Sequence, residues 1–110
     1  MKLTIEIDDE SYVQSYLSIL SIGILECLEQ ELITYDDAMK LLYFPRLIDK
    51  FETMLPDVGE AMHLGTELED VAELIPDKLK ESIEQIRILN KKSINFNRNT
   101  KQHVFYKINV

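Results

Sequence analysis

Residues 10–33 hold large apolar side chains at almost every angular position around a helix, so the chain must adopt a fold that buries this segment on several sides. These residues are Tyr12, Val13, Tyr16, Leu17, Ile19, Leu20, Ile22, Ile24, Leu25, Cys27, Leu28 and Leu32. A helix that is apolar on most sides is a core helix. Gly23 costs about 1 kcal/mol of helix stability relative to Ala, which predicts close packing of another helix at Gly23, Ser18 and Ser21.

The two ends of the chain show the period-two alternation of strands. Apolar residues alternate over residues 3–7 and again over residues 104–110, and residues 94–96 predict a further short strand. Because a lone two-stranded sheet is marginal in water, we expect both ends to join in a small sheet backed by the helices. Pairing with another copy of the chain is the alternative, since exposed strand edges favour it.

Capping residues and prolines divide the middle of the chain into short helices. Thr34 predicts a helix start, with its hydroxyl accepting from the backbone near Asp37. Pro45 suits the first turn of the next helix. Pro56 ends that helix, and Asp57 with Glu60 has capping spacing for another.

Gly65 and Thr66 predict a corner between two helices. Gly65 would take the left-handed conformation that ends a helix, and Thr66 with Glu69 reads as a capping box that starts the next. Ile75 would line the inner face of that second helix. Ile88 lies opposite the apolar face of the last helix, where we expect the terminal segment to cover it.

These elements predict one domain of class α+β over residues 1–110, with mainly helical structure. About five short-to-medium helices would surround a buried central helix, and the terminal strands would form a small antiparallel sheet. The expected parts are a strand at 2–8, a helical body at 10–91 and a basic extended segment at 93–110.

No uninterrupted apolar run approaches the roughly 18 residues that span a bilayer, and the first residues lack the layout of a secretory signal, so we expect no membrane partner and a cytoplasmic location.

Charge is distributed unevenly along the chain. Residues 1–75 hold 4 basic and 17 acidic residues, a net charge of −13, whereas residues 76–110 hold 8 basic and 3 acidic residues, a net charge of +5. One interpretation is that the basic end lies on the acidic body of its own chain. The other is that the acidic body binds a basic partner.

Few residues are candidates for chemistry. Glu60, His63 and Glu67 form an E-x-x-H-x-x-x-E pattern, which is a weak metal candidate because metal centres in helical bundles use Glu-x-x-His twice and the chain has it once. The predicted break at Gly65 would also separate His63 from Glu67.

Cys27, the single cysteine, is expected as a buried and unreactive thiol. Phosphate-binding and nucleophile motifs are absent from the sequence, and we expect no cofactor.

Basic and aromatic residues alternate near the C-terminal end, as in some nucleic-acid-binding proteins. They are Arg87, Lys91, Lys92, Phe96, Arg98, Lys101, Phe105, Tyr106 and Lys107. Such residues contact phosphates and stack on bases. The acidic body repels the same polyanion, and alternating aromatics are equally typical of a strand, so nucleic acid is not the partner that we expect.

Two segments carry a resemblance to a known family. They are SIGILECLEQELITYDDAMKLLYFPRLID and HLGTELEDVAELIPDKLKESIEQI. Over about residues 2–86 the chain resembles a small family of bacterial proteins of roughly this length whose function is uncharacterised. The resemblance implies a bacterial cytoplasmic protein and transfers no activity, cofactor or catalytic residue.

Two classes of function therefore remain. In the first, which we favour, the protein is a non-enzymatic interaction module that docks a basic partner, as bacterial immunity or antitoxin-like proteins do. Its contact residues would be acidic: Asp36, Asp37, Glu67, Glu69, Asp70 and Glu73. In the alternative, it is an enzyme or a metal-binding helical protein that uses Glu60 and His63.

Overall fold

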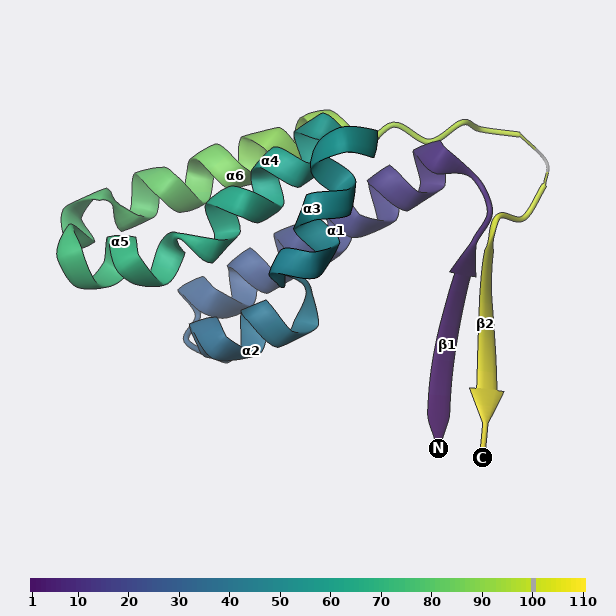
Figure 1. The fold of residues 1–110 in the computed structure, drawn as a ribbon, viewed down its shortest axis with the longest axis horizontal. Coiled ribbons are helices and arrows are strands. Elements are labelled where there is room, and N and C mark those ends of the chain that lie inside the picture. The colour runs from purple at the N-terminus through teal and green to yellow at the C-terminus, as the bar shows by residue number, and fades with distance from the viewer. Residues whose placement is uncertain (100) are drawn as a thin grey trace.

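A computed structural model describes residues 1–99 and 101–110 of the chain, which form a mainly helical α+β fold (Figure 1). The sequence prediction of fold class is confirmed. In chain order, the described elements are β1 (Lys2–Ile7), α1 (Glu10–Glu29), α2 (Tyr35–Leu41), α3 (Pro45–Met54), α4 (Pro56–Thr66), α5 (Leu68–Leu74), the 3-10 turn η1 (Pro76–Lys78), α6 (Leu79–Ser93) and β2 (Val104–Asn109).

The core lies where α1, α4 and α6 pack together, with α3 packed on α4. Its apolar residues include Leu25, Leu42, Met62, Leu68 and Ile86. A buried polar cluster crosses this core. The Oγ of Ser21 lies 2.7 Å from the hydroxyl of Tyr43 and accepts a hydrogen bond of 2.7 Å from the Nδ2 of Asn90. Burial raises the pKa of Tyr43 to about 12, since the phenolate would lose its hydration.

Helix α1 is buried on one side only, and the expectation of a central helix surrounded by others was wrong. The side against α6 carries Ser15, Ser18 and Ser21, whereas Ile19 and Leu20 face outward. Cys27 is half-buried rather than buried. Among the described residues, α1 is also long and apolar enough to cross a membrane by length and composition alone, a test that core helices of soluble proteins pass too.

The predicted helix starts at Thr34 and Pro45 are confirmed, whereas those at Asp57 and Thr66 were wrong. The hydroxyl of Thr34 accepts from the N–H of Asp37, and the Asp37 carboxylate accepts from the N–H of Thr34, which completes a capping box. Pro45 occupies the first turn of α3. Asp57 does not cap α4, because that helix already begins at Pro56 and Asp57 lies inside its first turn.

The predicted break at Gly65 was also wrong. α4 continues through Gly65 to Thr66, and Gly65 has no positive φ. Thr66 donates from its hydroxyl to the carbonyl of His63 instead of capping α5. Glycine is needed for a different reason, because a Cβ at Gly65 would lie 2.8 Å from the ring of Tyr43.

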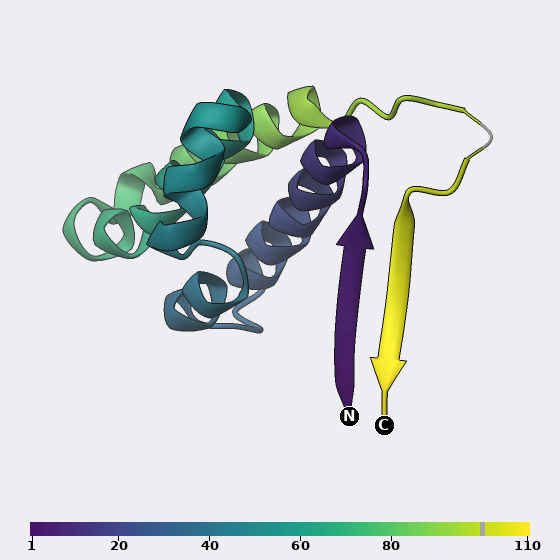
Figure 2. The same ribbon diagram turned by 45° about the vertical axis from the view of Figure 1, so that its right-hand side comes forward.

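The two ends of the chain pair as predicted, in an antiparallel sheet with Leu3 opposite Ile108 and Ile5 opposite Tyr106. The expectation that helices back this sheet was wrong. The sheet extends away from the helical body, and β1 and β2 remain largely exposed (Figures 1 and 2). Residues 94–96 form no strand. They belong to a segment without regular structure whose Asn95 and Asn97 donate backbone N–H groups to Ser15 and Ser11 of α1.

Candidate partner-docking surface

The acidic residues of α4 and α5 lie in a stretch of the chain that has no strongly basic side chain. Residues 51–77 contain eight carboxylates, one histidine and no Lys or Arg. Four of the predicted contact residues lie at α5, namely Glu67, Glu69, Asp70 and Glu73, and all four are exposed. This end of the molecule therefore has a concentrated negative charge.

An apolar groove lies within this acidic region. It has a volume of about 410 Å³ and is lined by Glu67, Asp70, Val71, Leu74 and Ile75. Leu74 is 77% exposed and Ile75 is 53% exposed. The sequence prediction that Ile75 lines the core was wrong, because α5 ends at Leu74 and the chain leaves the helix at Ile75 with φ −141° and ψ 63°. Pro76 was the signal in the sequence, because the residue before a proline is biased away from helical geometry.

A second acidic group surrounds Tyr35 at the start of α2. Burial raises the pKa of the Tyr35 hydroxyl, and the nearby carboxylates of Glu69 and Glu31 raise it further. The fold thus brings the first turn of α5 close to α2, which the sequence did not predict. Glu31 was missed as a site residue. It follows α1 with a φ of 56°, in the position where helices commonly end on glycine.

Asp36 and Asp37, predicted as contact residues, are already engaged within α2. Asp36 forms an ion pair of 2.8 Å with Lys40. Hydrogen bonds from Thr34 lower the pKa of Asp37. Both carboxylates serve the start of their own helix, so α5 rather than α2 carries the carboxylates that lie beside the groove.

His63 lies between two carboxylates. Its Nδ1 is 3.5 Å from Glu52 and its Nε2 is 3.4 Å from Glu67. Because α4 is not broken at Gly65, His63 and Glu67 do share a face, and Glu52 of α3 takes the place that the sequence pattern assigned to Glu60. Within residues 1–99 and 101–110, no three His, Cys, Asp or Glu side chains converge as a metal site.

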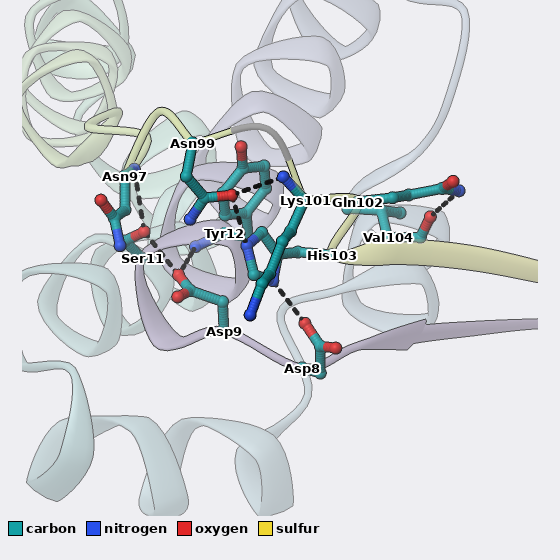
Figure 3. Close-up of polar contacts among 10 residues, drawn as sticks. All are labelled: Asp8, Asp9, Ser11, Tyr12, Asn97, Asn99, Lys101, Gln102, His103 and Val104. Carbon is teal, nitrogen blue, oxygen red and sulfur yellow. Dashed lines mark hydrogen bonds and ion pairs between the residues drawn. The ribbon is translucent and has the colours of Figure 1, made fainter.

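A polar cluster at the base of the terminal sheet contains the other histidine (Figure 3). The Nδ1 of His103 lies 2.7 Å from Asp8, and its Nε2 lies 3.2 Å from Asn99. The ring also packs against Tyr12 in a tilted arrangement, at a centroid distance of 4.7 Å. Nucleophilic catalysis needs a hydroxyl that a base can activate, but Ser11 donates to Asp9 and not to His103. The cluster instead attaches the sheet to the start of α1.

Comparison with known proteins identifies the family. No curated protein and no solved structure matches the chain at a significant level. A family model described as "Protein of unknown function (DUF3969)" matches residues 8–108 of the 110 in the chain. The match extends further than the resemblance seen in the sequence and includes the basic C-terminal segment. This chain is therefore a member of the DUF3969 family.

Proposed function

We propose that the protein is a non-enzymatic binding module and that the α5 end of its helical body docks a basic partner protein. The observation that carries this proposal is the apolar groove in the acidic region. Leu74 and Ile75 present exposed apolar surface, and Glu67 and Asp70 lie beside them. Apolar anchors supply most of the binding free energy in protein interfaces, and charges around them set partner choice and on-rate.

Charge favours a basic partner over an acidic one. With eight carboxylates and no Lys or Arg over residues 51–77, an acidic protein would be repelled before contact, whereas a basic protein would be attracted at long range. The association rate should then fall as salt screens the attraction. A basic nuclease has the required positive charge. Immunity and antitoxin-like proteins bind and neutralise such nucleases, and this chain would act in the same way.

The test is affinity capture from the native cell, followed by binding kinetics with the captured protein. We expect a basic partner whose association rate falls about tenfold or more between about 50 and about 500 mM salt. Leu74→Ser should weaken binding by about tenfold or more. Met54→Ser is the matched control, because Met54 is a similarly exposed apolar residue on α3 and should leave the affinity unchanged.

An acidic partner, salt-independent association, or a Leu74→Ser variant that binds like the wild type would each contradict the proposal. Asp70→Asn distinguishes charge from packing. It should reduce the association rate more than it raises the dissociation rate, because Asp70 lies on the rim of the groove.

A further inference from the structure

The terminal sheet has one apolar face and one polar face. The strand register places six apolar residues on the same face: Leu3, Ile5, Ile7, Val104, Tyr106 and Ile108. The opposite face carries Glu6 and Lys107, which form an ion pair of 2.8 Å, together with Lys2, Thr4, Phe105 and Asn109. Such an amphipathic sheet normally packs its apolar face on a core.

Among the described residues, most of that face is left uncovered, although Ile7 and Val104 at its base are half-buried. Ile108 is 64% exposed and Tyr106 is 57% exposed. The sheet projects from the helical body (Figure 1), and Tyr106 contacts Tyr16 of α1. An isolated two-stranded sheet is marginal in water and needs further strands or a packed face for stability, so a folded terminal sheet requires a covering partner.

The outward side of α1 continues this apolar surface. The hydroxyl of Tyr106 lies 3.1 Å from that of Tyr16, which places Tyr16 on the side of α1 that faces the sheet. Positions three, four and seven residues further along a helix share its face, and they are Ile19, Leu20 and Gly23. Ile19 and Leu20 are exposed, and a Cβ at Gly23 would meet no atom within 4 Å.

We infer that a second copy of this chain covers the surface formed by these two faces. This terminal apolar surface consists of Leu3, Ile5, Tyr16, Ile19, Leu20, Gly23, Tyr106 and Ile108. It contains no charged residue, so two copies can meet there in a two-fold contact without burying like charges. A basic partner would find no carboxylate on it. Because α5 and the terminal sheet lie at opposite ends of the molecule (Figure 1), such a dimer also keeps the two acidic α5 ends away from the contact.

The exposed area is of the size that a dimer needs. A fully exposed large apolar side chain presents roughly 150–200 Å², so the six exposed large side chains of the surface leave roughly 500 Å² uncovered in each copy. A standard interface buries roughly 800 Å² per partner, and interfaces between identical subunits are more apolar than average. Polar atoms around the apolar surface supply the rest of the area that such an interface buries.

Sedimentation equilibrium of the full chain tests this inference. At about 100 µM, well above a micromolar Kd, we expect twice the monomer mass of 12.9 kDa. Ile5→Lys and Ile19→Lys should each raise the dimer Kd by about tenfold or more. Phe105→Lys is the control for the sheet, since Phe105 is as exposed as Ile5 but lies on the polar face. Ile88→Lys on α6 is the control for α1, because it makes the same change at a similarly exposed isoleucine.

Circular dichroism of each variant establishes that the helices are still folded, and only folded variants are compared. A chain that sediments at the monomer mass overturns the inference. A dimer whose Kd rises as much in the two control variants as in Ile5→Lys and Ile19→Lys overturns it as well. Because the groove beside Leu74 lies on α5, Leu74→Ser should leave the dimer Kd unchanged. A failure of the dimer inference can therefore be distinguished from a failure of the proposed partner binding.

Discussion

Ser21→Ala should destabilise the fold far more than the same substitution at Ser18. Both serines belong to α1, and both are fully buried. Ser21 joins two other buried groups, the hydroxyl of Tyr43 and the Nδ2 of Asn90, with both distances at 2.7 Å. Ser18 only donates to the carbonyl of Gln14 in its own helix, at 2.8 Å.

The magnitude follows from the groups left without partners. Ala at position 21 would leave the Tyr43 hydroxyl and one N–H of Asn90 buried and unpaired, at about 1–3 kcal/mol each. Ala also gains about 0.5 kcal/mol of helix propensity over Ser. The expected loss in the free energy of unfolding is therefore about 2–5 kcal/mol. For a domain of this size, it corresponds to a Tm lower by about 10 °C or more.

Urea unfolding followed by circular dichroism measures both variants under the same conditions. Ser18→Ala should stay within about 0.5 kcal/mol of the wild type, because the Gln14 carbonyl keeps its helical hydrogen bond. If Ser21→Ala costs less than about 1 kcal/mol, or no more than Ser18→Ala, the three groups do not act as a buried network. A Ser21→Ala/Tyr43→Phe double variant should recover part of the loss, since it also removes the orphaned hydroxyl.

Three further predictions concern single positions. The folded-state pKa of Tyr43 is raised to about 12. The stabilisation from neutral Tyr43 should therefore be complete below about pH 10, and the free energy of unfolding should fall by up to about 3 kcal/mol as the pH rises from about 10 to 12. Unfolding measured across that pH range should lack this fall in Tyr43→Phe. Glu31→Gly should raise the free energy of unfolding by about 1 kcal/mol, because Glu31 has a φ of 56° that costs an L side chain about this much. Gly59→Ala should lower the Tm and cost about 2 kcal/mol or more, since the new Cβ would lie 2.6 Å from the backbone N of Glu52 and force α3 and α4 apart.

Local rules predicted those features of the fold that local physics determines. The N-cap at Thr34 and the start of α3 at Pro45 both depend on residues within three positions of one another. The period-two alternation at both ends likewise predicted the strands and their pairing. The acidic character of the candidate docking surface was equally visible, because it is a count along the chain.

Features that depend on distant neighbours were not predictable in the same way. Gly65 is the residue type that commonly ends a helix. In the structure, however, glycine is needed there because the ring of Tyr43 occupies the space of a Cβ. A glycine required by close approach and one required by a positive φ look identical in a sequence. The clustering of Glu31 and Glu69 at Tyr35 was hidden for the same reason, since three elements must first pack together.

The orientation of α1 ties these results to the inferred dimer. Hydrophobicity alone would turn Ile19 and Leu20 inward and the serines outward. The chain does the reverse, because Ser21 pairs with Asn90 of α6 and Ser15 accepts from the N–H of Asn95, so a serine side can be buried without unpaired groups. A helix with apolar residues on most sides then keeps an apolar side exposed in the single chain. A second copy that covers this side would bury Ile19 and Leu20 while the serines on the opposite side keep their hydrogen bonds.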